Sequence, residues 1–447
     1  MAAPVPSLGE PFHRPLTHLE VKLEANRCLY CYDAPCMNAC PTHIDVASFI
    51  AKIAAGNLTG SAHVIMDANP MGASCARVCP TDQLCEGACV YKKDGAPIRI
   101  GDLQRYAVDA AMRDGTRLFE AGAPTGHTVA IVGGGPAGLS AARDLRRMGH
   151  AVTIFEAREM LGGLNTYGIV PFRLPIETAL WEAEQVVELG AEVRANVRVG
   201  RDVAMDALLA EYDAIVLACG MGGVPHLGIP GEELAGVWDA LEFIERVKLG
   251  RDIGALGSRI AVIGAGNTAI DALTCSRRIA RQAGAGGGEA RVTMYYRRGE
   301  RQMSAYGFEY DFAKQEGIEF RFFCAPTRIV GEGGHVRAIE FVRTRLDTSE
   351  GGEAAVPVSG TEFVEPIDTV VRAIGQSRLV ETFDRLGIAH DGGVVRVDEN
   401  LQTTRPGVYA AGDCIFAKGT REAMVVEAAE QGKCAARSID TYLRRGA

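Results

Sequence analysis

Residues 129–138 read Val-Ala-Ile-Val-Gly-Gly-Gly-Pro-Ala-Gly, and this stretch decides the fold of most of the chain. An apolar strand runs directly into glycines at G-x-G-x-x-G spacing, a helical pattern follows, and a second apolar strand ends in Glu156. The first glycine permits a tight turn, the second lets the backbone approach a pyrophosphate, and the third lets the helix pack closely on the strand. This order predicts a Rossmann-like dinucleotide-binding fold, with Glu156 placed to accept from ribose hydroxyls; the alternative is an ordinary glycine-rich turn of an α/β domain. The residues expected at the phosphates are Gly133, Gly135, Pro136, Ala137 and Gly138.

The same pattern occurs a second time, starting at the strand of residues 260–263. A long helix and another strand follow, but that strand ends in Arg297-Arg298 rather than in an acid. Arginine at this place accommodates a 2′-phosphate, so the second site favours NADPH over NADH; the alternative is a pair of solvated arginines. The loop residues expected to contact the nucleotide are Gly264, Ala265, Gly266, Asn267 and Thr268.

Two dinucleotide sites in one chain suggest a flavin and a nicotinamide, and two further segments favour FAD for the first site. Gly162-Gly163-Leu164 follows Glu156 closely. Near the C-terminus a short apolar strand ends in Gly412-Asp413, which is placed to meet the polyol chain of a flavin. Thr420 can cap the last helix, whose positive end suits an anionic reduced flavin ring.

Thirteen cysteines are distributed unevenly, and eight of them lie between residues 28 and 89. They form two quartets: Cys28, Cys31, Cys36 and Cys40, then Cys75, Cys79, Cys85 and Cys89. In a reducing compartment such a block indicates metal or cluster ligands rather than disulfides. Four thiolates serve one [4Fe–4S] cube, so the block predicts two clusters. The alternative is zinc, which prefers paired knuckles separated by a spacer.

The order of these pieces predicts an α/β chain that begins with an all-helical iron–sulfur domain at residues 1–123. The FAD domain then occupies residues 124–235 and 376–447. A second Rossmann-like domain, for NAD(P)H, is inserted into it at residues 236–375. Apolar strands at 214–218 and 370–374 mark the two places where the chain passes between the FAD domain and the inserted domain.

Composition limits the partners that we expect. The 447 residues carry 47 basic and 56 acidic side chains, a net charge of −9, which disfavours nucleic acid or an anionic membrane. No apolar run reaches the roughly 18 residues that span a bilayer, and the first residues lack the pattern of a secretion signal. We therefore expect a cytoplasmic protein.

The cysteine block carries a resemblance to a known family. Cys28-Leu-Tyr-Cys-Tyr-Asp-Ala-Pro-Cys-Met-Asn-Ala-Cys-Pro41, together with Cys79-Pro-Thr-Asp-Gln-Leu-Cys-Glu-Gly-Ala-Cys89, resembles the N-terminal half of dihydropyrimidine dehydrogenase and the separate bacterial flavoprotein subunit of that enzyme. The glutamate synthase small subunit is a close relative. The resemblance continues through Pro171–Pro175, Tyr296–Arg298 and Gly412-Asp413, and so covers nearly the whole chain. The five-residue gap between Cys79 and Cys85 looks more like the pyrimidine enzyme.

The resemblance implies two cluster sites with crossed ligands. The first would be held by Cys28, Cys31, Cys36 and Cys89, and the second by Cys40, Cys79, Cys85 and Gln104. Spacing alone would instead make Cys75 the last ligand and Gln104 an ordinary helix residue, and both readings stay open.

The resemblance also assigns the nucleotide contacts. For FAD it implicates Glu156, Leu164, Arg173, the backbone at Val199, Asp413 and Thr420; for NADPH it implicates Asn267, Thr268, Arg297, Arg298, Ala373, Ile374 and Gly375. The mammalian enzyme has a further arginine where this chain has Ser304, so NADH remains an alternative.

These features predict a converter of paired into single electrons. Nicotinamide gives up hydride, cubes accept one electron at a time, and a flavin between them does both, so no proton-transfer residue is required. A pyrimidine-reducing site needs a further FMN domain, for which the sequence has no room. We therefore expect an FMN-bearing partner that reduces uracil or thymine to the 5,6-dihydro form.

Three rival functions remain. The chain could feed glutamate synthase instead, as its small subunit. It could be a disulfide reductase, although Cys219, Cys275 and Cys324 are far apart and residues 124–447 contain no C-x2-4-C motif. The N-terminal block could also be a zinc-bound docking module without a redox role.

Overall fold

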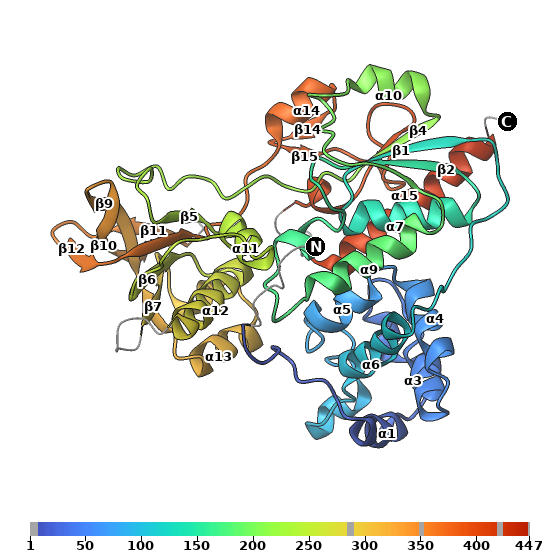
Figure 1. Cartoon of the computed structure of the whole chain (residues 1–447), viewed down its shortest axis with the longest axis horizontal. Coiled ribbons are helices and arrows are strands. Elements are labelled where there is room, and N and C mark those ends of the chain that lie inside the picture. The colour runs from blue at the N-terminus through green and yellow to red at the C-terminus, as the bar shows by residue number, and fades with distance from the viewer. Residues whose placement is uncertain (1–7, 284–289, 348–352, 418–422, 446–447) are drawn as a thin grey trace. The chain divides into compact units, whose positions relative to one another are not determined.

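The computed structural model describes residues 8–283, 290–347, 353–417 and 423–445. Two compact units divide the chain (Figure 1). The larger unit contains Pro11–Thr166, Arg173–Met221 and Arg378–Ala447, and the smaller unit contains Gly222–Ser377, Tyr167–Phe172 and the residues up to Glu10. The insertion therefore begins at Gly222, earlier than the predicted boundary at residue 236, and ends at Ser377 rather than at 375.

The larger unit begins with the predicted helical domain. Its helices are α1 (His18–Arg27), α2 (Pro35–Asn38), α3 (Val46–Ala54), α4 (Leu58–Ala68), α5 (Gly72–Val78) and α6 (Ile100–Arg113), with the 3-10 turn η1 (Val90–Asp94). Apolar residues at three- and four-residue spacing give α3 a buried face of Val46, Phe49, Ile50 and Ile53. The helix starts at Asp45, whose carboxylate accepts the backbone N–H of Ser48 at 3.0 Å.

A five-stranded parallel sheet, in the order β16-β4-β1-β2-β3, forms the rest of the larger unit. Its strands are β1 (Thr128–Val132), β2 (Ala151–Phe155), β3 (Glu192–Arg194), β4 (Ala214–Leu217) and β16 (Val408–Ala410). The helices are α7 (Pro136–Arg147), α8 (Leu164–Tyr167), α9 (Ile176–Val187), α10 (Met205–Glu211), α14 (Val380–Leu386) and α15 (Val425–Arg445). The short pair β14 (His390–Asp391) and β15 (Val394–Val395) and the 3-10 turn η4 (Gly412–Ile415) complete it.

The helical domain and this sheet share one apolar core, which runs from Phe49 and Ile65 to Leu139 and Ile154. In Figure 1 the blue and cyan helices α3–α6 lie below α7, α9 and α15. Buried cations join the two parts, because Arg143 donates to the carbonyls of Met66 and Asp67 and Lys433 donates to that of Ala68. Cations at the C-terminal end of α4 satisfy its last carbonyls.

The smaller unit repeats the layout of the first sheet, with the order β5-β13-β6-β7-β8. The strands are β5 (Val237–Asp239), β6 (Arg259–Ile263), β7 (Arg291–Tyr296), β8 (Glu319–Phe322) and β13 (Thr369–Arg372), and the helices are α11 (Ala240–Lys248), α12 (Asn267–Gln282) and α13 (Gly307–Gln315), with η3 (Glu300–Gln302). In this sheet β6, β7 and α12 reproduce the predicted strand–loop–helix–strand order. The predicted fold class, with a second Rossmann-like domain inserted in the first, is confirmed.

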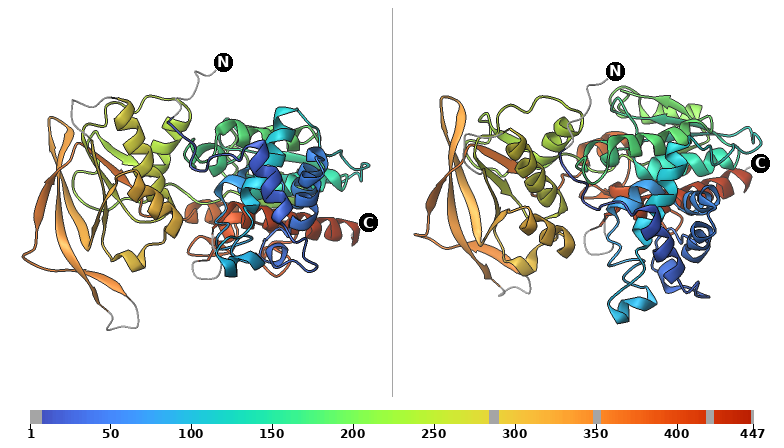
Figure 2. Two further views of the ribbon diagram at one scale, coloured as in Figure 1. Left: turned by 90° about the horizontal axis from the view of Figure 1, so that it is seen from below. Right: turned by 60° about the horizontal axis from the view of Figure 1, so that its bottom comes forward.

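An antiparallel sheet in the smaller unit has no counterpart among the sequence predictions. Its strands are β9 (Cys324–Glu332), β10 (His335–Asp347), β11 (Ala354–Pro357) and β12 (Phe363–Pro366), and they lie on the side away from α11–α13 (Figure 2). Phe341 of β10 stacks on Tyr295 of β7, with ring centroids 4.2 Å apart. Leu227, Ile229 and Leu234 pack against the same core, which explains why the unit begins before residue 236.

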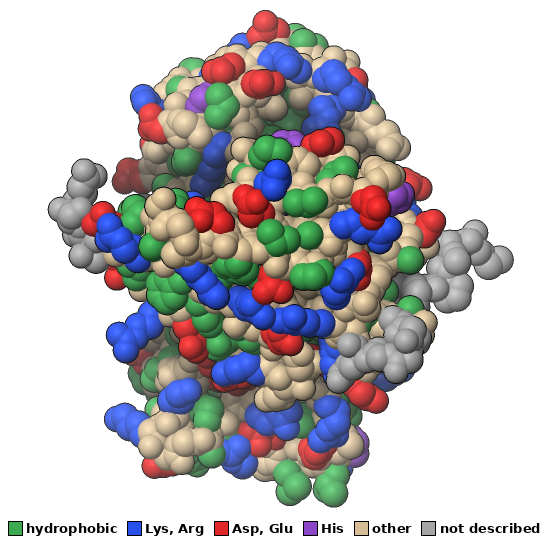
Figure 3. Space-filling model, turned by 90° about the vertical axis from the view of Figure 1, so that its left-hand side faces the viewer, with side chains coloured by type: hydrophobic (Ala, Val, Ile, Leu, Met, Phe, Trp, Pro, Cys, Tyr) green, Lys and Arg blue, Asp and Glu red, His purple; other side chains and the backbone are tan. Residues whose placement is uncertain are grey.

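Basic and acidic side chains are interspersed with hydrophobic ones on the face shown in Figure 3. One ion pair of the antiparallel sheet joins Arg328 of β9 to Glu340 of β10 at 3.0 Å. This face therefore carries charges of both signs. Within the described ranges, no helix combines the length and apolar character needed to cross a membrane.

Candidate cofactor sites

The first glycine loop joins β1 to α7, and its glycines are required for different reasons. Gly133 has a positive φ of 107°, and a Cβ there would lie 2.4 Å from the carbonyl oxygen of Ala218. A Cβ on Gly138 would lie 1.9 Å from the carbonyl oxygen of Gly133, so only glycine lets α7 pack this closely on β1. Gly135 has ordinary backbone angles, and its Cβ would meet nothing nearer than 3.8 Å. The open space at Gly135, with Pro136 and Ala137 starting α7 beside it, fits a pyrophosphate at the helix N-terminus.

Glu156 lies directly after β2, with 8% of its surface exposed. Its carboxylate accepts the backbone N–H of Gly134 and that of Arg158, each at 2.8 Å. The acid therefore lies against the glycine loop, where the ribose of a bound dinucleotide would meet it.

Two segments distant in sequence close around this loop. The backbone N–H of Gly162 donates to the carbonyl of Gly134 at 2.7 Å, and a Cβ on Gly163 would lie 2.9 Å from the Cα of Gly135. A Cβ on Gly412 would lie 2.9 Å from the Cβ of Ala137. The structure thus brings together the three segments that the sequence assigned to the flavin.

The other predicted flavin contacts are placed as follows. Leu164 begins α8, Val199 is buried, and Arg173 is buried with its guanidinium 5.4 Å from the ring centroid of Phe12. Burial raises the pKa of Asp413, whereas Arg378, which donates to the Asp413 carbonyl at 3.2 Å, lowers it. Thr420 lies outside the described residues.

The second glycine loop has the same construction. Gly264 has a φ of 134°, and a Cβ there would lie 2.1 Å from the carbonyl oxygen of Ala373. The backbone of Ala305 donates to Ala265 at 3.2 Å, and that of Tyr306 donates to the side chain of Asn267 at 3.1 Å. Thr268 lies in the first turn of α12, Ile374 and Gly375 are exposed after β13, and a Cβ on Gly266 would find Ser304 Oγ as its nearest neighbour at 3.2 Å.

The arginine pair follows β7 directly. The carbonyl of Arg297 accepts the Thr344 hydroxyl at 2.7 Å, and that of Arg298 accepts the backbone N–H of Phe323 at 3.2 Å. These bonds fix the backbone, while the Arg297 side chain is exposed and Arg298 is half-buried. Among the described residues, the buried Nε of Arg298 has no hydrogen-bond partner. An exposed guanidinium here suits a 2′-phosphate.

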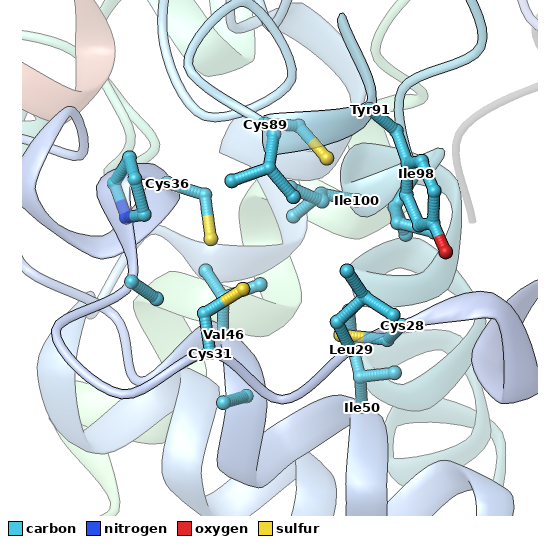
Figure 4. Close-up of a pocket in the computed structure, with 14 residues that line it drawn as sticks. Cys28, Leu29, Cys31, Cys36, Val46, Ile50, Cys89, Tyr91, Ile98 and Ile100 are labelled. Carbon is cyan, nitrogen blue, oxygen red and sulfur yellow. The ribbon is translucent and has the colours of Figure 1, made fainter. Parts of the chain in front are cut away.

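Four cysteines from both quartets line a single pocket in the helical domain. Figure 4 shows the sulfur atoms of Cys28, Cys31, Cys36 and Cys89 surrounding its centre. Apolar side chains, among them Val46, Ile50, Ile98 and Ile100, form the rest of the lining. Across the described residues, no three His, Cys, Asp or Glu side chains converge closely enough to hold one metal ion. The thiols instead enclose a space.

The thiols of this pocket are close enough to raise one another's pKa. Burial, together with the neighbouring thiols of Cys89 and Cys28, raises the pKa of Cys36 to about 11. Such a donor set fits a cationic iron–sulfur cluster, because bound metal stabilises the thiolate form that burial disfavours.

A second group of thiols lies next to the first. The pKa of Cys79 is raised by a hydrogen bond with Cys75, by burial, and by the thiols of Cys85 and Cys40. Cys40 thus neighbours the second quartet, as Cys89 neighbours the first, and this is the crossed arrangement that the resemblance implies. Cys36 also contributes to raising the pKa of Cys85, so the two groups are adjacent.

Gln104 and Cys75 are the two candidates for the eighth ligand, and they lie in α6 and α5. Gln104 is buried in α6, and its amide nitrogen donates to the carbonyl of Gly72, the first residue of α5, at 2.7 Å. Cys75 lies one turn further along α5 and is also buried.

Two pairings were not predicted. Glu182 of α9 is buried against the start of α5, where it accepts the backbone N–H of Ala73 at 2.7 Å. The thiols of Cys219 and Cys414 shift each other's pKa, although the two residues stand on opposite sides of the insertion. No local motif predicts either pair, because each joins elements that are distant in sequence.

Comparison with known proteins gives two family matches. Residues 9–116 match the dihydropyrimidine dehydrogenase domain II, 4Fe-4S cluster, and residues 127–432 match the pyridine nucleotide-disulphide oxidoreductases. The predicted iron–sulfur, FAD and NADP cofactor classes are thereby confirmed at the level of the domains.

Several characterised proteins are similar over nearly the whole chain. The NADP(+)-dependent formate dehydrogenase subunit beta of Moorella thermoacetica is 36% identical over 92% of this chain, which spans only 60% of that protein. The glutamate synthase [NADPH] small chain of Escherichia coli is 33% identical over 96% of this chain and 93% of its own length. The NAD-dependent dihydropyrimidine dehydrogenase subunit PreT of Escherichia coli is 32% identical over 94% and 93%.

Solved structures share the fold. FprA of Mycobacterium tuberculosis, in complex with NADPH, has a TM-score of 0.58 and 22% identity, covering 72% of this chain and 85% of that one. The thioredoxin reductase of T. acidophilum has a TM-score of 0.53 and 22% identity, covering 71% and 98%.

Proposed function

Because this chain belongs to the pyridine nucleotide-disulphide oxidoreductase family and carries an N-terminal 4Fe-4S domain of the dihydropyrimidine dehydrogenase type, we propose that it is the electron-entry subunit of a larger oxidoreductase. When bound, NAD(P)H supplies paired electrons, FAD exchanges them one or two at a time, and [4Fe–4S] clusters carry them singly. The pocket that Cys28, Cys31, Cys36 and Cys89 surround is the observation that carries the proposal.

The residues divide the work of holding these groups. The open backbone at Gly135 and the acid of Glu156 would hold FAD, and the loop at Gly266 with Arg297 would hold NADPH. The pocket thiols would hold one cluster; Cys40, Cys79, Cys85 and Gln104 would hold the other, with Cys75 as the alternative. Hydride transfer between bound cofactors needs no acid or base from the chain. The residues that hold the cofactors therefore position them and adjust their electronic properties.

The rim of the pocket lined by Cys28, Cys31, Cys36 and Cys89 is where electrons would pass to a partner. Leu29 and Val90 line this pocket and are 58% and 40% exposed, and Tyr32, between Cys31 and Cys36, is fully exposed. Exposed apolar side chains grouped around a redox site favour a protein partner at this rim.

We propose as that partner an FMN-bearing subunit that reduces uracil or thymine to the 5,6-dihydropyrimidine. The gap between Cys79 and Cys85 and the similarity to the PreT subunit support this assignment. The alternative, a glutamate synthase large subunit, is supported by a similarity of the same size.

The test begins with the full chain purified without oxygen. We expect bound FAD, about eight iron and eight acid-labile sulfide per chain for two cubes, and bleaching of the flavin by NADPH. Cys36→Ser should lower the iron content by half, whereas Cys275→Ser, at a buried thiol in the smaller unit, should leave it unchanged. Protein with zinc in place of iron and sulfide would refute the proposal.

Mixing the reduced chain with each candidate partner then identifies the acceptor. We expect uracil reduction with the FMN-bearing pyrimidine subunit and NADPH. Glutamate formation with the glutamate synthase large subunit, without uracil reduction in the first mixture, would instead establish the alternative.

A further inference from the structure

Two cysteines that are distant in sequence meet at the carboxyl edge of the parallel sheet in the larger unit. β4 and β16 are adjacent parallel strands, with Leu217 opposite Ala410, so the turns that follow them emerge side by side. Cys219 lies in the first turn and Cys414 lies in the second. The two thiols are close enough to shift each other's pKa, and the Cys414 thiol donates to the Leu217 carbonyl at 3.4 Å and to the Ala411 carbonyl at 3.3 Å.

Both turns pack against the first glycine loop. A Cβ on Gly133 would lie 3.1 Å from the Cα of Cys219. Gly412, two residues before Cys414, approaches Ala137 at the start of α7 in the same way. Any change in how the two turns are joined therefore acts directly on the backbone that we assign to FAD.

The two thiols differ in ways that suit a sequential reaction. Cys219 lies in a partly exposed turn, and its interaction with Cys414 lowers its pKa, so it is the thiol of the pair that ionises first. Cys414 is buried, and the same interaction and its burial raise its pKa. A reactive thiol beside a second, less acidic thiol is the arrangement that favours disulfide formation over irreversible oxidation.

We propose that Cys219 and Cys414 are a peroxide-reactive pair that closes to a disulfide across the flavin-binding loop. The Cys219 thiolate attacks hydrogen peroxide, the O–O bond breaks, and a sulfenic acid and one water form. The Cys414 thiol then attacks the sulfenic sulfur, an S–S bond replaces the S–O bond, and a second water leaves. In total, two thiols and one peroxide give one disulfide and two waters, and peroxide accepts the two electrons.

The experiment uses the full, FAD-loaded chain treated with stoichiometric hydrogen peroxide. After alkylation and digestion, mass spectrometry should find the Cys219 and Cys414 peptides linked and two hydrogens lighter, and dithiothreitol should separate them. Both thiols found fully alkylated would overturn the proposal, as would Cys219 oxidised to sulfinic acid without any linked peptide.

Variants separate the pair from general oxidation. In Cys414→Ser, we expect Cys219 to stop at the sulfenic acid, which dimedone traps; in Cys219→Ser, we expect Cys414 to stay reduced. Cys275→Ser is the matched control and should cross-link like the native chain. The visible band of bound FAD should shift as the cross-link forms, and an unchanged band in fully linked protein would contradict an action on the flavin loop. None of these readouts depends on the electron acceptor, so failure here is distinct from failure of the proposed function.

Discussion

Glu182 of α9 and Ser74 of α5 are joined by two hydrogen bonds, one through the backbone and one through the side chains. Oε1 of Glu182 accepts the backbone N–H of Ser74 at 2.9 Å, and Oε2 contacts the Ser74 hydroxyl. The carboxylate is 1% exposed. Since Ser74 precedes Cys75 and Cys79, this contact ties the flavin-binding part of the larger unit to the second group of thiols.

Removing this carboxylate should destabilise the larger unit. In Glu182→Ala, the buried N–H groups of Ala73 and Ser74 lose their acceptor, and each unsatisfied group costs about 1–3 kcal/mol. We expect a lower thermal midpoint and a lower iron content. Glu182→Gln keeps an acceptor oxygen and is the control; if it loses as much stability as the alanine variant, the two accepted N–H bonds are not the cause.

The same residue predicts a pH dependence. Burial raises the pKa of Glu182 from 4.5 to about 7, against the lowering effect of its hydrogen bonds. Between these values the folded chain keeps a proton that the unfolded chain has lost, so this group destabilises the fold as the pH rises, by at most about 3 kcal/mol.

Comparison with Glu182→Gln isolates this effect, because the cofactors are the same in both proteins. The thermal midpoint of the variant should gain on that of the native chain between about pH 5 and pH 8. A difference that stays constant over this range would contradict the raised pKa.

The two glycines Gly135 and Gly138 should respond differently to alanine. At Gly135 the backbone angles are ordinary and the nearest atom to a new Cβ is 3.8 Å away, so Gly135→Ala should fold normally and bind FAD at least about tenfold more weakly. At Gly138 the Cβ would lie 1.9 Å from a backbone oxygen, so Gly138→Ala should lose folded protein as well. Circular dichroism and FAD titration separate the two losses; normal FAD affinity in folded Gly135→Ala would show that FAD does not approach there.

Gln104 and Cys75 can be distinguished by substitution. If Gln104 completes the second site, Cys75→Ser should keep both clusters, and Gln104→Ala should perturb one. Gln104→Cys should lower the reduction potential of that cluster, since thiolate adds negative charge to it. Iron analysis and electron paramagnetic resonance of the reduced proteins provide the readout, and loss of a cluster in Cys75→Ser alone would reverse the assignment.

Arg297 should distinguish NADPH from NADH. Its exposed guanidinium would pair with the 2′-phosphate, so Arg297→Ala should raise KM for NADPH about tenfold and leave KM for NADH nearly unchanged. Ser304→Arg places a second cation beside Gly266 and should increase the preference for NADPH. Arg291→Ala, at the opposite end of β7, is the control. Equal increases in the KM values for NADPH and NADH would show that Arg297 does not bind the 2′-phosphate.

The parts of this molecule that the sequence predicts are those built from short, contiguous signals. The glycine spacings predict both loops, because Gly133 and Gly264 adopt positive φ and closely approach the residue after a neighbouring strand of the sheet. The apolar spacing in residues 46–55 predicts α3.

Other features depend on contacts between distant segments. β10 alternates buried residues with charged ones, so its long antiparallel pairing with β9 leaves no continuous apolar run to detect. Leu227 and Leu234 stand in an irregular segment without periodicity, so no local signal in the sequence marks the start of the smaller unit. The Glu182–Ser74 and Cys219–Cys414 pairs bring together residues from separate elements, which spacing along the chain does not encode.

The two ends of the inserted segment are bonded to each other. The backbone N–H of Gly222 donates to the Ser377 carbonyl at 2.9 Å, and that of Ser377 donates to the Gly223 carbonyl at 2.8 Å. The chain therefore enters and leaves this segment at neighbouring residues. A lineage could exchange one coenzyme module for another at this junction, and so change its electron donor, without rebuilding the sheet that receives it.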